Sequence, residues 1–260
     1  MSLMGSLRAK GKDAGSGGRV SRFVRELGLQ PVLIAVLVLV LYLWVTSHQL
    51  DKIELVTLNR DFLTTAILQH LMLSFVSAAI IVAVAVPLGV LLTRPRLRAA
   101  SPIVLILANI GQAFPAVGLV ILMGIKFGFG VPIAVAAFTA YGLLPILRNT
   151  IVGLQQIDQF VVESARGMGM TARQALFRVE LPLAVPVILA GIRTTLILTV
   201  GVATLGVFVN GGGLGTIIVP GLKLGRQTVL VTGGVLTAAL AFTLDWIARV
   251  AERVLRPRGI

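Results

Sequence analysis

The chain has 260 residues, of which 57% are hydrophobic and only 13% charged, with a mean hydropathy of +0.98. A soluble domain carries about twice that charged fraction, so lipid must be the solvent for much of this chain, and a disordered protein is excluded. The formal net charge is +13, but the basic residues are scattered between apolar runs, which argues against a nucleic-acid partner. Cysteine is absent and His48 and His70 lie far apart, so we expect no disulfide, no thiolate and no metal site.

Residues 1–28 are basic and contain Gly and Ser, and they precede the first apolar run. We interpret them as a flexible cytoplasmic tail, followed by a membrane domain over 29–260. A cleaved signal peptide is the alternative interpretation of the first run. The long basic segment, and the lack of a small-x-small cleavage motif after Thr46, favour a retained helix.

Six apolar runs have about the length needed to cross a bilayer as helices. They are continuous rather than alternating, which favours helices over the strands of a barrel. The sequence therefore predicts an all-α fold, a polytopic membrane helix bundle of about six transmembrane helices. The runs are 31–46, 70–93, 102–125, 131–151, 186–209 and 229–248.

The distribution of Lys and Arg predicts the orientation of these helices. One set of termini and loops holds 17 of the 23 basic residues, the opposite set holds five, and Arg193 lies inside a run. The richer set should face the cytoplasm, so both termini are expected there and the chain in the cytoplasmic (inner) membrane. Arg193 is expected to snorkel toward that face or to bond neighbouring helix ends.

A few polar residues inside the runs are candidates for lining a solute pathway. Asn109 and Gln112 share one helix face and precede Phe114 and Pro115, where we expect a kink. Hydrogen bonds between helices are the alternative role for such residues. The full set of candidates is Asn109, Gln112, Phe114, Tyr141, Thr194 and Thr195.

No carboxylate lies near the centre of a run, which argues against a carrier driven by protons or sodium. Asp245 lies near the cytoplasmic end of the last run, four residues before Arg249. We expect these two residues to form an ion pair on the helix surface.

A polar, basic insert at about 153–185 interrupts the apolar pattern between the fourth and fifth runs. It predicts a helix over 158–168, a left-handed turn at Gly169, and a second helix over 172–179 capped by Thr171. Pro182 and Pro186 mark the return to the membrane. Such an element offers a compact surface to a cytoplasmic partner, and a loop that merely covers helix ends is the alternative.

The segment 210–215 follows the fifth run on the expected outer side and contains Gly211, Gly212, Gly213 and Gly215. Its glycines let the backbone bend and pass closely, which favours an outer gate or a tight re-entrant turn over a plain linker. No strand precedes it, so it is not a nucleotide-binding loop. The chain also lacks the Gly-x4-Gly-Lys-Ser/Thr sequence that an ATPase motor requires.

The spacing within the insert resembles the EAA loop of binding-protein-dependent ABC importers. The family pattern is Glu-Ala-Ala, three residues, Gly, nine residues, Ile, one residue, Leu-Pro. Ser164 replaces the middle Ala and Val179 replaces Ile here. The resemblance implies a permease with the fold of the methionine importer, whose loop docks on an ATP-binding subunit. The matching residues are Glu163, Ser164, Ala165, Gly169, Val179, Leu181 and Pro182.

Further stretches resemble the glycine betaine, carnitine and choline branch of this family. They occur in the order expected and lie at 141–150, 168–171, 179–183, 190–194 and 212–215. The resemblance therefore implies a permease for compatible solutes, namely glycine betaine, choline, carnitine or a related quaternary ammonium compound.

The same resemblance implies what surrounds the chain. We expect no enzymatic activity and no cofactor in this subunit, with ATP and Mg bound by a partner ATPase. The expected partners are two ATP-binding subunits, a second permease chain of the same or a paralogous kind, an extracytoplasmic solute-binding protein and membrane lipid. The alternatives are a permease for another nutrient such as methionine or a sulfonate, an ATP-independent carrier or channel, and an intramembrane enzyme. The enzyme is disfavoured because no Ser/His, paired-carboxylate or His-rich constellation lies at one depth.

Overall fold

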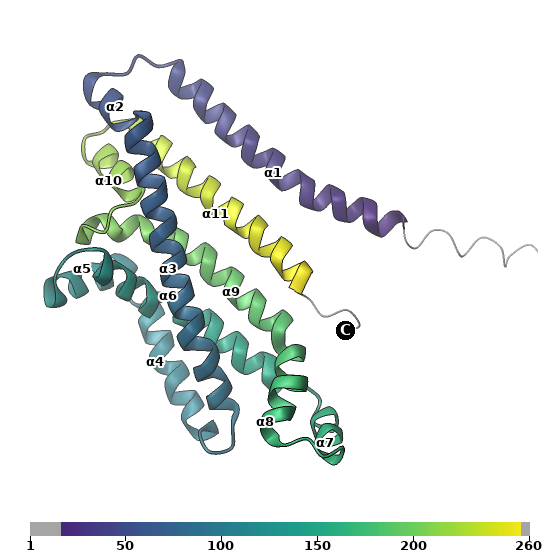
Figure 1. The fold of residues 1–260 in the computed structure, drawn as a ribbon. Coiled ribbons are helices and arrows are strands. Elements are labelled where there is room, and N and C mark those ends of the chain that lie inside the picture. The colour runs from purple at the N-terminus through teal and green to yellow at the C-terminus, as the bar shows by residue number, and fades with distance from the viewer. Residues whose placement is uncertain (1–16, 256–260) are drawn as a thin grey trace, which may run out of the picture.

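The computed structural model describes residues 17–255, which form helices and connecting turns without any strand (Figure 1). This agrees with the predicted all-α class. The elements are α1 (Gly17–Thr46), α2 (Lys52–Thr57), α3 (Arg60–Thr93), η1 (Arg98–Ala100), α4 (Ser101–Ala113), α5 (Ala116–Phe127), α6 (Val131–Gln155), α7 (Gln159–Gly167), α8 (Ala172–Ala175), η2 (Leu176–Glu180), α9 (Leu181–Ala203), η3 (Thr204–Val209), α10 (Gly215–Lys223) and α11 (Gln227–Leu255).

Helix α6 is the centre of the bundle, where it packs against α3, α9, α4 and α5. Phe138 of α6 is fully buried in a cluster with Leu73 of α3 and Val209 at the end of η3. Glycines let the helices approach closely. A Cβ placed on Gly89 of α3 would lie 2.7 Å from the Thr150 side chain of α6. Close backbone approach of this kind is how helices associate in lipid, where burial of apolar surface gives no net drive.

Within the described residues, five helical segments are long and apolar enough to cross a membrane. They are Gly28–Thr46, Arg60–Thr93, Val131–Gln155, Ala172–Val209 and Gln227–Val254, and they include five of the six predicted runs.

The predicted run 102–125 is not one straight helix. It consists of α4 and α5, and the helical pair Arg98–Ala113 and Ala116–Phe127 is bent by 95°. Phe114 adopts an extended conformation (φ −66°, ψ 139°), as residues before proline tend to do, and Pro115 has no N–H with which to continue the helix. The kink expected at this dipeptide is confirmed, and it is sharp enough to divide the predicted third run into two helices. Neither arm, at about 20 Å or less, crosses the roughly 30 Å hydrocarbon core alone.

Helix boundaries differ from the predicted runs at several ends. Helix α1 begins at Gly17, so residues 17–28 of the expected flexible tail are helical, whereas residues 1–16 lie outside the described part. Helix α3 begins at Arg60, ahead of the predicted start at 70. The fifth run tightens into a 3₁₀ segment at Thr204 before it reaches Val209.

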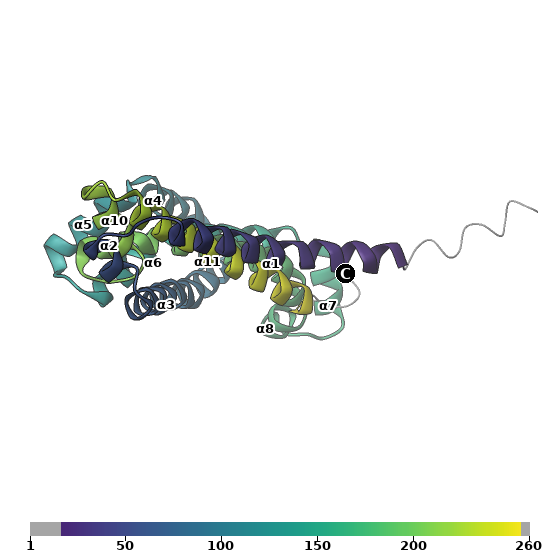
Figure 2. The same ribbon diagram turned by 90° about the horizontal axis from the view of Figure 1, so that it is seen from above.

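Helix α1 lies alongside α11 in both views of the molecule (Figures 1 and 2), and α11 is its main packing partner. The link from α1 to α3 contains α2, whose N-cap residue Asp51 also forms an ion pair with Arg226 at the start of α11. The first and last helices are thus joined along the same edge of the bundle.

Candidate functional site

Helix α7 projects from one end of the bundle and is followed by α8, which turns back toward α9 (Figure 1). Its start is fixed by Asp158, whose Oδ1 accepts a hydrogen bond from the Phe160 N–H at 2.9 Å. The predicted first helix at 158–168 is therefore confirmed to within one residue at each end.

The turn after α7 follows the predicted chemistry. Gly169 has φ +89°, a left-handed conformation that costs glycine little, and the Met170 N–H donates to the Ala165 carbonyl at 3.2 Å. Thr171 caps the next helix by accepting from the Gln174 N–H at 3.2 Å, while Gln174 Oε1 accepts from the Thr171 N–H at 2.8 Å. This reciprocal capping box sets the direction in which the chain returns.

The sequence led us to expect that the second helix ends before Pro182. In the structure it does not end there. Helix α8 continues through a π-helical segment, η2, directly into α9, and the Leu181 N–H bonds to the Leu176 carbonyl. The ring of Pro182 excludes the carbonyl four residues earlier, and the wider π turn accommodates that loss. The insert is therefore joined to a transmembrane helix without a flexible break.

Apolar side chains are exposed on the surface of the insert. Phe160 is 76% exposed, Met168 75% and Phe177 58%, so the chain's own helices leave most of each side chain uncovered. The Arg173 guanidinium lies 5.9 Å from the centre of the Phe177 ring. A shallow groove of about 360 Å³ separates α7 from η2, and its lining residues are Phe160, Val161, Ser164, Ala165, Met168 and Val179.

The residues that match the EAA pattern have different environments. Glu163 and Ser164 are exposed, Ala165 is buried, and Val179, Leu181 and Pro182 are half-buried. Glu163 Oε1 accepts a hydrogen bond from Gln159 Nε2 at 2.6 Å. This bond lies within α7, so the carboxylate supports its own helix instead of pairing with an arginine.

An ion pair that the sequence did not reveal anchors the base of the insert. Glu180, at the end of η2, is buried, and its two carboxylate oxygens accept from Arg94 Nη1 at 3.2 Å and Nη2 at 2.6 Å. Arg94 is the C-cap residue of α3. The bidentate pair therefore fastens the junction of insert and α9 to α3.

The glycine-rich segment between η3 and α10 forms a tight turn held from α3. Gly212 and Gly213 have φ values of +82° and +85°, and the Gly213 N–H donates to Gln69 Oε1 at 3.1 Å. A Cβ on Gly215 would lie 1.9 Å from the Thr204 carbonyl oxygen, so a side chain is excluded there. The glycines therefore form a tight turn, as the sequence predicts.

His70 is fully buried beneath this turn and was not predicted to have a role. Its Nδ1 accepts from the Leu214 N–H at 3.3 Å, and its Nε2 lies 3.0 Å from the Val200 carbonyl. This arrangement selects the neutral ring with the proton on Nε2. One side chain thus connects α3, α9 and the glycine-rich turn.

The pathway candidates have different environments in the single chain. Asn109 Nδ2 and Thr194 Oγ1 donate to carbonyls of their own helices, whereas Thr195 is buried and donates from α9 to the Gly142 carbonyl of α6 at 3.3 Å. Phe114 is exposed at the bend, Gln112 is half-buried, and Tyr141 packs beside the cluster around Phe138. Of the candidates, Thr195 alone makes a hydrogen bond to another helix within the described part of the chain.

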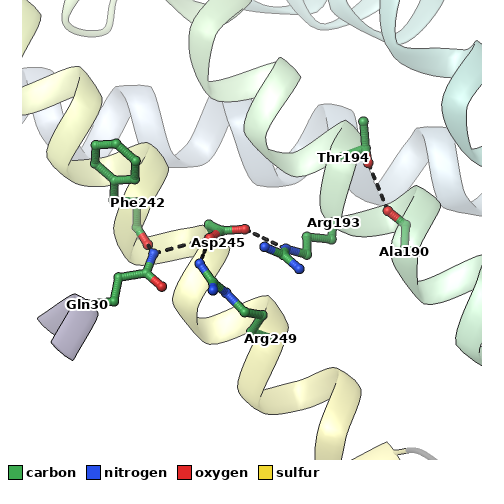
Figure 3. A network of polar contacts seen from close by, with 7 residues as sticks. All are labelled: Gln30, Ala190, Arg193, Thr194, Phe242, Asp245 and Arg249. Carbon is green, nitrogen blue, oxygen red and sulfur yellow. Dashed lines mark hydrogen bonds and ion pairs between the residues drawn. The ribbon is translucent and has the colours of Figure 1, made fainter. Parts of the chain in front are cut away.

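Asp245 lies at the centre of a polar network at the end of the bundle where α1 begins (Figure 3). The predicted pair with Arg249 is present, but Asp245 is buried and not on the helix surface, because it also bonds to Arg193 of α9 and Gln30 of α1. Arg193 is therefore held by a carboxylate of α11. Among the described residues, no three His, Cys, Asp or Glu side chains gather as a metal site would require.

The helices, the broken span and the polar insert that continues into a membrane helix define a class of protein, a polytopic membrane protein with a polar helical element at one end. Residues 85–257 match the family described as "Binding-protein-dependent transport system inner membrane component". The chain belongs to this family.

Relatives with assigned names support this membership. The choline transport system permease protein OpuBB of Bacillus subtilis is 41% identical over 74% of this chain and 88% of its own length. The glycine betaine/carnitine/choline transport system permease protein OpuCB of the same organism is 39% identical over the same shares. The osmoprotectant import permease protein OsmW of Salmonella typhimurium is 36% identical over 81% of this chain and all of its own length.

Solved structures show the same fold. A chain of the MetNI methionine ABC transporter, determined in inward-facing conformations, matches with a TM-score of 0.64 and 28% identity, over 75% of this chain and 96% of that one. The fold expected from the EAA resemblance is therefore confirmed.

Proposed function

We propose that this chain is the membrane-spanning permease subunit of an ATP-driven importer of compatible solutes. Its ligands would be glycine betaine, choline, carnitine or a related quaternary ammonium compound, which are the solutes in the names of its relatives. The observation that carries the proposal is the insert, which matches the family spacing and exposes apolar side chains on a helix joined to a membrane span without a break.

In this proposal α7 and the turn after it dock into a groove on a separate ATPase that binds ATP and Mg. Phe160, Met168 and Phe177 supply the apolar contacts. Glu163, Ser164, Ala165, Gly169, Val179, Leu181 and Pro182 set the shape of the docking element. Because η2 leads directly into α9, movement of the docked helix is passed to the membrane domain. The Arg94 and Glu180 pair extends that movement to α3.

The complete importer contains two such ATPase subunits, a second permease chain and an extracytoplasmic solute-binding protein. Both termini of this chain face the cytoplasm, since the termini and loops on that side hold most of the Lys and Arg residues. The glycine-rich turn at Gly211, Gly212, Gly213 and Gly215 then lies on the outer side, where it serves as part of the gate that the solute-binding protein meets. The solute passes beside Asn109, Gln112, Phe114, Tyr141, Thr194 and Thr195, in a pathway that the second permease chain completes.

Uptake by proteoliposomes that contain this chain, its ATPase and its solute-binding protein tests the proposal. We expect ATP-dependent uptake of labelled glycine betaine, in competition with choline or carnitine. Competition by methionine or a sulfonate alone would assign the chain to another nutrient. Uptake that persists without the ATPase would instead indicate an ATP-independent carrier or channel.

The docking role of the insert is tested by Met168→Glu, which places a charge on an exposed apolar contact. We expect it to reduce co-purification of the ATPase and to abolish uptake, with membrane insertion unchanged. Leu224→Glu is the matched control, because Leu224 is 60% exposed in the turn between α10 and α11, away from the insert. Equal loss of co-purification in both variants would contradict the assignment of the insert.

A further inference from the structure

A groove of about 500 Å³ runs between α1 and α11, within the range of about 300–1,000 Å³ that is typical of small-molecule sites. On the α1 side it is lined by Leu29, Leu33, Ile34 and Leu37, which follow the helix for about 12 Å. Phe242 lines the α11 side. Most of the groove is therefore apolar and matches the hydrocarbon interior of a bilayer.

One end of the groove is polar and carries positive charge (Figure 3). Asp245 is buried there, and it accepts from Arg193 Nε at 2.5 Å, from Gln30 Nε2 at 3.2 Å and from Arg249. Gln30 Nε2 also donates to the Phe242 carbonyl at 3.0 Å. Among the residues whose side chains the structure describes, two guanidinium groups thus face one carboxylate, so this network has one more positive than negative charge.

Both guanidinium groups have N–H donors left over. An arginine has five such donors, yet Arg193 uses only its Nε, and Arg249 only one Nη, in bonds with the part of the chain that the structure describes. The Arg249 side chain lines the groove and is 36% exposed, so its remaining Nη donors can be reached from there. Arg249 Nε is buried and has no hydrogen-bond partner. An acceptor at this point would satisfy donors that are costly to leave unpaired beside lipid.

We propose that the groove binds one anionic phospholipid of the leaflet at the end of the bundle where α1 begins. The lipid phosphate accepts hydrogen bonds from the free Nη donors of Arg249, which lines the groove, and one acyl chain lies along Leu29, Leu33 and Leu37. In a phospholipid a negatively charged headgroup is followed by apolar acyl chains. The groove has the matching arrangement, because its cationic end is followed by an apolar lining. Basic sites between transmembrane helices near the membrane surface are where such headgroups bind.

Native mass spectrometry of the purified full chain tests this site, with dioleoyl phosphatidylglycerol and dioleoyl phosphatidylcholine as the two probes. We expect retention of phosphatidylglycerol to exceed that of phosphatidylcholine by about fivefold, the factor for one cation near an anionic headgroup. Arg249→Gln should remove that preference. Arg98→Gln should keep it, since Arg98 is an exposed cation of η1 that takes no part in this network. No preference in the wild type, or equal loss in both variants, would overturn the proposal.

Leu33→Trp keeps all the charges and fills the groove, so it tests the acyl-chain contact independently of Asp245. We expect it to lower phosphatidylglycerol retention about as much as Arg249→Gln does, whereas unchanged retention would overturn the proposed binding mode. The chain has no cysteine, so Leu33→Cys can carry a single benzophenone label. Photo-adducts with phospholipid in phosphatidylglycerol vesicles support the site. Adducts with a second permease chain would show that protein fills the groove.

Discussion

Gly167 and Gly169 lie two positions apart near the end of α7, but they differ in backbone conformation. Gly167 is helical, with open space where a Cβ would lie, whereas Gly169 has φ +89°. We expect Gly169→Ala to destabilise the turn by about 1 kcal/mol and to reduce uptake, because an L-residue is strained in this region. Gly167→Ala should leave uptake unchanged or improve it, since alanine favours the helix. Transport assays on the two variants, normalised to the amount of chain in the membrane, make the comparison, and equal effects would contradict it.

His70 is a second residue whose role comes from the backbone groups around it. His70→Leu leaves the Leu214 N–H and the Val200 carbonyl without a partner in a buried place, and each such group costs about 1–3 kcal/mol. We therefore expect a lower unfolding temperature in detergent. His48→Leu is the control, because His48 is exposed and bonds only within its own turn. A variant at position 70 as stable as the control would show that the bridge contributes little.

Local residue signals were predictable from the sequence, and distant pairings were not. Gly169 and Thr171 act through backbone groups within a few positions, so their types and spacing sufficed to predict the turn. Arg94 and Glu180 are 86 positions apart, and Arg193 and Asp245 are 52 apart. Only the packing of α3, α9 and α11 brings these partners together, and no local pattern encodes that packing.

At the scale of elements, the ion pair between Arg94 and Glu180 joins the insert to a second transmembrane helix. Glu180→Gln keeps the side-chain shape but removes the charge that the guanidinium binds. We expect co-purification of the ATPase to be retained, because the insert can still dock. We expect uptake per ATP hydrolysed to fall, because less of the movement of the insert would be passed to α3. The ratio of solute transported to phosphate released is the measurement.

Arg96→Gln is a suitable control for that variant, since Arg96 is an exposed cation close to Arg94 in the chain and forms no ion pair among the described residues. Its transport ratio should match that of the wild type. If Glu180→Gln lowered hydrolysis and uptake in the same proportion, the pair would have a structural role only.

Proline produced different outcomes in different elements. At Pro115 the preceding residue is extended and the predicted third span breaks by 95°, whereas at Pro182 the helix persists because a π turn absorbs the missing N–H. The sequence marks both places as potential breaks. Whether a proline breaks the helix depends on whether neighbouring helices hold the chain straight. At Pro182 the chain is held by Glu180, two residues earlier, which forms an ion pair with Arg94 of α3.

At the scale of the whole molecule, the predicted orientation can be tested because the chain lacks cysteine. Met168→Cys and Leu224→Cys each place one thiol on an exposed position in a different connection of the bundle. We expect a membrane-impermeant maleimide to label Leu224→Cys in intact cells, and Met168→Cys only after the membrane is opened. The reverse pattern would invert the orientation and would separate the insert from a cytoplasmic ATPase.

The packing of α1 against α11 has a consequence for the time course of synthesis. The helix that leaves the ribosome first has as its main partner the helix that leaves last. At ribosomal rates of about 5–20 residues per second, α1 waits on the order of ten seconds or longer before α11 exists. During that interval the face of α1 that later meets α11 must be solvated without its partner, and the 19-residue apolar stretch Gly28–Thr46 is suited to lipid. Both α1 and α11 must therefore be translated before this edge of the protein can close, and a nascent chain stopped short of α11 would leave Gln30 without its bonds to Asp245 and Phe242.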